Sequence, residues 1–242
     1  MKTQKEIIYK NLAKYYDRIF SWKNYESDAN KIKLLIKKYK KSEGNNLLEV
    51  ACGTGMHIQY FRDSFSILAT DLNQSMLSIA QKRNPDVKFK KANMVDLNLS
   101  KKFDVILCLF ASIGYVKNYK NLHKTIENFS RHLKKGGIVI IEPWFSESSY
   151  VTGSPNMTTY SDENIKISRL CVFKKKGIIS ITDMHYLIAE RDKEVTHYID
   201  RHELAMFDTG MVLDIMMKNE LTASFLRKGL LKDRDLFIGV KK

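Results

Sequence analysis

The segment Leu47–Gly55 constrains the fold more than any other part of the chain. It begins as a mostly apolar strand, Leu47–Ala51, and runs directly into the small-residue turn Cys52-Gly53-Thr54-Gly55. Glycines in such a turn permit dihedrals that a side chain forbids, and they let the backbone approach a ligand closely. A second apolar strand, 67–70, ends in Asp71, whose carboxylate suits the two hydroxyls of a ribose. The pattern predicts a sheet whose edge binds a nucleoside.

Short apolar strands alternate with helical patterns over most of the chain. Strands are expected at 47–51, 66–70, 87–90, 103–109, 138–142, 223–226 and 236–240. Helices are expected at 3–20, 27–40, from Met56 onward, and at 74–82, 119–133 and 210–218. This alternation predicts an α/β fold, a doubly wound seven-stranded sheet whose parallel strands are joined by right-handed crossovers.

The alternation of strands and helices stops after Pro143. Strands are expected at 165–173, 178–189 and 194–206 with no helix between them, which indicates an antiparallel meander. We therefore expect an α/β nucleoside-binding domain formed by residues 1–145 and 208–242, and an inserted β subdomain at 146–207 for substrate binding or oligomerisation. The exposed edge of such an insertion makes a homodimer an expectation.

Composition narrows the class of protein. The 242 residues include 41 Lys and Arg against 27 acidic residues, a net charge of +14 that favours an anionic partner. The lysines are spread over the chain, so most of them are expected to be solvated surface and neither nucleic acid nor a membrane is the expected partner. The N-terminus has no secretory signal, no apolar run could span a bilayer, and Cys52, Cys108 and Cys171 are widely spaced. We expect a cytoplasmic protein with reduced, structural thiols.

The candidate ligand-binding residues all follow strands. The glycine turn, Asp71, Ala92-Asn93-Met94 and Leu109-Phe110-Ala111-Ser112 end successive predicted strands and thus share one edge of the sheet. The turn has neither the spacing of a phosphate loop nor the GxGxxG fingerprint of a dinucleotide fold. An adenine nucleoside without a triphosphate is the ligand that fits, with Asp71 at the ribose and Asn93 and Met94 at the adenine.

The chain resembles the class I S-adenosylmethionine-dependent methyltransferases. Within that class it is most similar to the dTDP-3-amino-3,6-dideoxyhexose N,N-dimethyltransferases of the desosamine and mycaminose type. The resemblance covers nearly the whole chain. It lies in Leu48-Glu49-Val50-Ala51-Cys52-Gly53-Thr54-Gly55, Arg83-Asn84-Pro85-Asp86-Val87, Ser112-Ile113-Gly114-Tyr115, Arg131-His132-Leu133, Glu142-Pro143-Trp144, Ile167-Ser168-Arg169, His185-Tyr186 and Arg234-Asp235-Leu236-Phe237. Where the family commonly has Gly-Asp-Met, this chain has Ala92-Asn93-Met94.

The resemblance implies N-methylation of a nucleotide-linked amino sugar, with S-adenosyl-L-methionine as cofactor. It places at the cofactor Tyr16, Tyr25, Ala51, Gly53, Gly55, Asp71, Asn93, Met94 and Leu109. It places at the sugar nucleotide Tyr9, Trp144, Arg169 and Arg234, with arginines suited to a diphosphate. Tyr115 is the candidate catalytic residue, which would orient the amine or accept its hydrogen bond.

Alternatives remain open from the residues alone. A methyltransferase for another class of acceptor, or a non-catalytic nucleoside- or polyanion-binding protein, is compatible with the same core. Tyr16, Tyr25 and Trp144 can serve as ordinary packing residues. His57, His123 and His132 are expected at surface or capping positions, and His185 and His202 have no partner at metal-ligand spacing, so no metal site is predicted.

Overall fold

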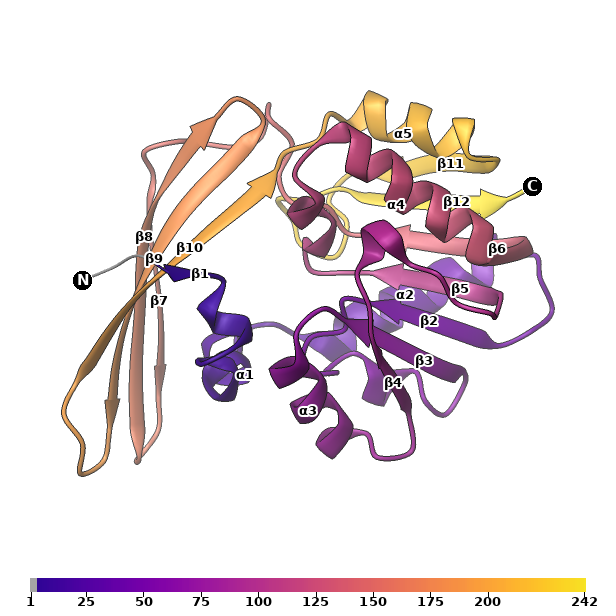
Figure 1. The fold of residues 1–242 in the computed structure, drawn as a ribbon. Helices are drawn as coiled ribbons and strands as arrows, with labels where there is room; N and C mark the ends of the chain where they lie inside the picture. Colours follow the sequence, from indigo (N-terminus) through magenta and orange to yellow (C-terminus); the bar gives the residue numbers. More distant parts are fainter. Residues whose placement is uncertain (1–3) are drawn as a thin grey trace.

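The computed structural model describes residues 4–242, which form two β-sheets with helices on both faces of the larger one (Figure 1). The larger sheet contains β2 (Asn46–Val50), β3 (Ser66–Asp71), β4 (Lys88–Lys91), β5 (Phe103–Cys108), β6 (Leu133–Ile141), β11 (Leu221–Leu226) and β12 (Leu236–Lys241). The smaller sheet contains β1 (Gln4–Lys5), β7 (Pro155–Ser161), β8 (Ile165–Lys176), β9 (Ile179–Glu190) and β10 (Thr196–Ala205).

The larger sheet has the strand order β11-β12-β6-β5-β2-β3-β4. Strands β2 to β6 are parallel to one another, whereas β12 is antiparallel to both β6 and β11. The order reverses between β2 and β5, which is the switch point where open α/β sheets bind ligands. The predicted doubly wound seven-stranded sheet is confirmed.

Four helices of ten residues or more accompany this sheet among the described residues: α2 (Tyr25–Tyr39), α3 (Gln74–Arg83), α4 (Tyr119–His132) and α5 (Thr209–Lys218). Three of them begin at a side chain that accepts a backbone N–H of the first turn, namely Asn24, Asn118 and Asp208. Such caps satisfy N–H groups that the helix itself leaves unpaired, and each stabilises the helix start by about 1 kcal/mol.

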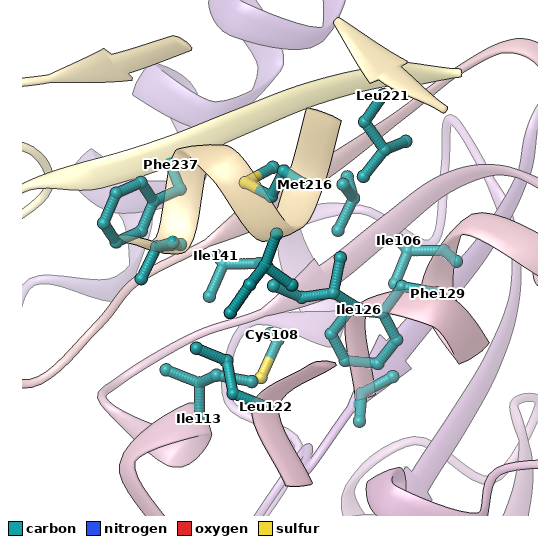
Figure 2. Packing of buried hydrophobic residues seen from close by; sticks show 14 of the residues in the cluster. Ile106, Cys108, Ile113, Leu122, Ile126, Phe129, Ile141, Met216, Leu221 and Phe237 are labelled. Carbon is teal, nitrogen blue, oxygen red and sulfur yellow. The ribbon is translucent and has the colours of Figure 1, made fainter. Parts of the chain in front are cut away.

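The alternation of side chains along β6 explains why both faces of the sheet are covered. Val139 and Ile141 pack with α4 and α5 on one face, whereas Ile138 and Ile140 pack with α2 on the other. Figure 2 shows the first of these clusters, in which Phe129 of α4 and Met216 of α5 meet the strands. Cys108 lies within it, and all three cysteines of the chain are buried and free.

The prediction of one helix over residues 3–20 is wrong. Residue 3 lies outside the described residues. From Gln4 onward the chain forms β1, the 3-10 turns η1 (Ile7–Tyr9) and η2 (Ala13–Tyr15), and the short helix α1 (Tyr16–Ile19). The carboxylate of Asp200 on β10 accepts the N–H groups of Ile7 and Ile8, each at 2.9 Å, and these contacts replace helical hydrogen bonds.

The helix predicted from Met56 is also absent. That segment contains only the 3-10 turn η3 (Ile58–Tyr60). The His57 ring is buried there, with its nitrogens 3.7 Å from Asp28 and 3.8 Å from Glu49, so long-range contacts fix the local backbone. His57 is therefore not a surface or capping residue.

The smaller sheet has the order β1-β10-β9-β8-β7, and its strands from β7 to β10 are antiparallel (Figure 1). Strand β7 was not predicted, because most of its side chains are polar and exposed and no apolar alternation marks it. The two-residue strand β1 pairs in parallel with β10 and ties the N-terminal segment to this sheet. Within residues 4–242, no helix combines the length and apolar character needed to cross a membrane.

Candidate active site

A cavity of about 390 Å³ lies at the carboxyl ends of β2, β3 and β5. Its wall contains most of the predicted cofactor residues, together with the predicted catalytic residue and one predicted substrate residue. These are Tyr9, Tyr16, Tyr25, Ala51, Gly53, Asp71, Asn93, Met94, Leu109 and Tyr115. The structure thus brings together side chains from the N-terminal segment, α2 and four successive strand ends.

Backbone conformations that side chains disfavour are concentrated at this edge. Ala51, Phe110 and Ala111 have φ angles of 55°, 52° and 64°, and they follow β2 and β5, the strands on either side of the switch point. A non-glycine residue in this region is strained by about 1 kcal/mol or more. Such strain is typical of a backbone shaped for a ligand.

The two glycines of the turn serve different purposes. Both have positive φ, 56° at Gly53 and 73° at Gly55. A Cβ at Gly53 would meet nothing within 4 Å, whereas a Cβ at Gly55 would lie 2.9 Å from the Asn84 amide nitrogen and 3.1 Å from the Ala80 Cβ. Gly53 therefore leaves open space at the cavity, and Gly55, which is not a wall residue, permits close packing against α3.

Asp71 is fixed by backbone donors at the end of β3. Its carboxylate accepts the Gly53 N–H at 2.9 Å and the Asn73 N–H at 2.8 Å, and only 7% of the residue is exposed. Burial raises the pKa of Asp71, while the hydrogen bonds from Asn73 and Gly53 act in the opposite direction. Each carboxylate oxygen keeps a lone pair for a further donor, as recognition of a ribose requires.

Glu49 also lines the cavity and was missed by the sequence analysis. It lies on β2 with 2% exposure, and its Oε2 has no hydrogen-bond partner among the described residues. Burial and the nearby Asp71 raise the pKa of Glu49 to about 8. A buried carboxyl group with an unused oxygen at a cavity is suited to a cationic ligand group. The signal available in the sequence was an acidic residue interrupting an apolar strand.

The N-terminal segment lines part of the cavity and is anchored to the glycine turn. Asp17 of α1 accepts a hydrogen bond from Thr54 Oγ1 at 2.6 Å and one from Arg83 Nη2 at 2.5 Å. Arg83 in turn donates to the Thr54 carbonyl. These contacts hold Tyr16 beside the cavity, so this aromatic residue packs and lines the site at the same time.

Tyr115 belongs to a series of side chains joined by hydrogen bonds, which also includes Tyr9, His202 and Asp200. It lies in the 3-10 turn η5 (Ser112–Val116) after β5, and its hydroxyl is 2.8 Å from the Tyr9 hydroxyl and 2.6 Å from His202 Nδ1. His202 Nε2 is 3.0 Å from Asp200 Oδ2. No role was predicted for His202 or Asp200 from the sequence.

Trp144 and Arg234 lie outside the main cavity, at a second hollow of about 80 Å³. The Arg234 guanidinium stacks 4.3 Å above the Trp144 ring. Arg234 Nε and Trp144 Nε1 are buried and have no acceptor among residues 4–242. Unused donors on a stacked arginine are suited to an anionic ligand group.

Arg169 of β8 is buried, and its Nε likewise lacks an acceptor in the described part of the chain. Its guanidinium lies 5.2 Å from the Phe20 ring, and Phe20 packs edge-on against Phe110 with centroids 5.2 Å apart. Because Phe110 lines the cavity, Arg169 is two aromatic rings away from it. No cluster of His, Cys, Asp or Glu in residues 4–242 has the composition of a metal site.

Comparison with known proteins agrees with this geometry. The methyltransferase-domain family matches residues 47–137. A dTDP-3-amino-3,4,6-trideoxy-alpha-D-glucopyranose N,N-dimethyltransferase of Streptomyces venezuelae is 30% identical over 219 residues, covering 90% of this chain and 92% of that protein. A dTDP-3-amino-3,6-dideoxy-alpha-D-glucopyranose N,N-dimethyltransferase of Streptomyces fradiae is 29% identical, covering 95% and 90%.

Solved structures give the same result. The crystal structure of Streptomyces venezuelae DesVI superposes with a TM-score of 0.90 at 29% identity, over 96% of this chain and 98% of that one. The S-adenosylmethionine-bound amino pentose methyltransferase CalS10 of Micromonospora echinaspora shares the fold, with a TM-score of 0.85 at 20% identity and full coverage of both chains, each 100%. The resemblance stated from the motifs is confirmed: the chain belongs to the class I S-adenosylmethionine-dependent methyltransferases, in the family that contains the dTDP-amino-deoxysugar N,N-dimethyltransferases of Streptomyces.

Proposed function

We propose that this enzyme transfers a methyl group from S-adenosylmethionine to the amino group of a nucleotide-linked amino-deoxysugar, with dTDP as the nucleotide. The observation that carries the proposal is the pairing of a nucleoside-sized cavity with a separate pair of unsatisfied arginine and tryptophan donors at Arg234 and Trp144. The first fits the cofactor and the second fits a diphosphate. The relatives named above act on dTDP-amino sugars according to their names.

The cavity wall carries two carboxyl groups and an amide that suit the polar groups of S-adenosylmethionine. Asp71 would hold the ribose hydroxyls, and Glu49 would hold the ammonium of the methionine part. The Asn93 Oδ1 already accepts the Val95 N–H at 3.0 Å, so its amide NH₂ is the group left for the adenine edge beside Met94. Tyr16, Tyr25, Ala51, Gly53 and Leu109 would supply the walls.

When bound, S-adenosylmethionine supplies an electrophilic methyl group, so that an N–C bond forms as the C–S bond breaks and the positive charge passes from sulfur to nitrogen. The protein mainly has to align the reactants and exclude water. Tyr115, with Tyr9 beside it, would orient the acceptor amine at the cavity. Arg234 and Arg169 would hold the diphosphate, and Trp144 would pack against the sugar nucleotide.

The smaller sheet is proposed to present the acceptor. In this division, residues 1–145 and 208–242 bind the cofactor, and the insertion 146–207 binds substrate and forms a homodimer through its β7 edge. We place the enzyme in the cytoplasm, where nucleotide sugars and reduced thiols occur together. Size-exclusion chromatography with light scattering tests the dimer, and a monomeric mass at micromolar concentration would contradict it.

The experiment for the main proposal is incubation with isotopically labelled S-adenosylmethionine and a panel of dTDP- and UDP-linked amino sugars, read by mass spectrometry. We expect a gain of one or two methyl groups on amines and none on the matching sugars that carry a hydroxyl in place of the amine. Methylation of the hydroxyl sugars, or of none of the panel, would contradict the proposed acceptor.

A further inference from the structure

The hydroxyl of Tyr115 begins a series of hydrogen bonds that leads from the cavity into the smaller sheet. Tyr115 lines the cavity, His202 and Asp200 lie on β10, and the latter two are only 3% and 0% exposed. The distances from Tyr115 to His202 and from His202 to Asp200 are 2.6 and 3.0 Å. Packing alone does not explain why a polar histidine ring is buried between a phenol and a carboxylate.

The hydrogen bonds at Asp200 fix the direction of the whole series. Its carboxylate accepts the Ile7 and Ile8 N–H groups, each at 2.9 Å, so both oxygens are acceptors. His202 Nε2 must then carry the hydrogen that Asp200 Oδ2 accepts, which leaves Nδ1 as an acceptor. Tyr115 therefore donates its hydroxyl hydrogen to Nδ1, and Tyr9 donates to the Tyr115 oxygen at 2.8 Å.

Every donor in this series thus points along it toward Asp200, and Nδ1 of the imidazole is the only unprotonated nitrogen in it. The two phenols are not bases themselves, because burial raises the pKa of Tyr115 and of Tyr9 well above the ordinary value. Few other charges surround the histidine: Glu6 lines the same cavity, and the neighbouring Glu203 is paired with Lys5 and Lys117.

We propose that His202, oriented by Asp200, accepts a proton from the acceptor ammonium through the Tyr115 hydroxyl. This inference rests on the proposed function. The ammonium N–H bond breaks as its proton moves to the Tyr115 oxygen, while the original hydroxyl proton of Tyr115 moves to His202 Nδ1. The amine regains the lone pair needed for attack, and the imidazolium is stabilised by the Asp200 carboxylate. His202 is a positioning and relay residue, because it reaches the substrate only through Tyr115.

The relay predicts how kcat depends on pH. An enzyme with the relay can use the ammonium form of its substrate, whereas an enzyme without it depends on amine that arrives already neutral. His202→Gln keeps a donor and an acceptor in the side chain but cannot carry a proton. We expect its kcat to fall by about tenfold or more near pH 6.5 and to approach the wild-type value near pH 9.5. Tyr115→Phe also removes the hydroxyl that orients the amine, so its kcat should be reduced at every pH and reduced further at low pH. The double variant should lose no more than Tyr115→Phe alone, because His202 acts only through that hydroxyl.

The matched control is His185→Gln, since His185 is an exposed histidine on β9 of the same sheet. It should retain the wild-type pH profile. A His202→Gln enzyme whose kcat is reduced equally at every pH, or not at all, would overturn the relay while leaving the proposed function intact. A wild-type enzyme that methylates no amino-sugar nucleotide would instead overturn the proposed function.

Discussion

Substitution of Glu49 tests whether a buried carboxyl group in the cavity binds the cationic group of the ligand. The substitution Glu49→Gln keeps the size of this buried side chain and removes its ability to ionise. In the wild-type protein the pKa of Glu49 is raised from 4.5 to about 8, chiefly by burial and further by Asp71. Its neutral form is therefore favoured in the folded state.

The sign and size of the effect on stability follow from proton linkage. Because the folded pKa lies above the unfolded one, the stability that Glu49 contributes is complete below pH 4.5 and is lost as the pH rises toward about 8. One pKa unit corresponds to about 1.4 kcal/mol, so the loss between about pH 5 and about pH 7.5 amounts to about 3 kcal/mol. Glu49→Gln, which stays neutral throughout, escapes this loss.

The assay is chemical denaturation of both proteins across this pH range without cofactor. The free energy of unfolding of Glu49→Gln, relative to wild type, should increase by about 3 kcal/mol from about pH 5 to about pH 7.5. In parallel, calorimetric titration should show S-adenosylmethionine binding to the variant about ten- to a hundredfold more weakly. The ammonium of the bound cofactor would stabilise the ionised form of Glu49 and form with it a charge-assisted hydrogen bond that the variant lacks. Parallel stability curves for the two proteins, together with equal cofactor affinity, would show that Glu49 neither ionises in this pH range nor contacts the cofactor.

Three further substitutions separate the parts of the site. Asp71→Asn leaves one acceptor for the two backbone N–H groups of Gly53 and Asn73, so we expect the free energy of unfolding to fall by about 1–3 kcal/mol and cofactor affinity to fall about tenfold or more; unchanged affinity, measured by calorimetry, would argue against the ribose contact. Arg234→Gln should raise the KM for the sugar nucleotide about tenfold or more and leave the cofactor Kd unaltered, and steady-state kinetics showing an unaltered KM would remove the diphosphate role. Gly55→Ala, whose Cβ would lie 2.9 Å from an Asn84 nitrogen, should lower the free energy of unfolding by about 1–3 kcal/mol in a denaturant titration, and a wild-type stability would contradict this packing role.

Much of the fold and part of the site were predictable because the relevant signals are local. The apolar strands ending at Ala51 and at Asp71, and the helical patterns of α2 to α5, place the cavity at the correct edge of the sheet. The expected ends of these elements differ from the observed ones by at most two residues.

The features that sequence reasoning missed depend on distant partners. The N-terminal segment is not one helix because Ile7 is paired with Asp200, 193 residues further along the chain. His202 had no visible role because its partner Tyr115 is 87 residues away, and a single histidine in a strand carries no local pattern. Glu49 resembled an ordinary polar interruption of a strand, since only the three-dimensional structure reveals that its carboxyl group lies buried at a cavity.

We propose that one cavity at the sheet edge holds the methyl donor while Tyr115 faces the acceptor amine beside it. The most direct measurement is a crystal structure of the complex with S-adenosylhomocysteine and a dTDP-linked amino sugar. We expect the ribose hydroxyls on Asp71, the sugar amine within about 3 Å of the Tyr115 hydroxyl, and the diphosphate at Arg234 and Arg169. A nucleoside bound elsewhere, or an amine facing away from Tyr115, would contradict it.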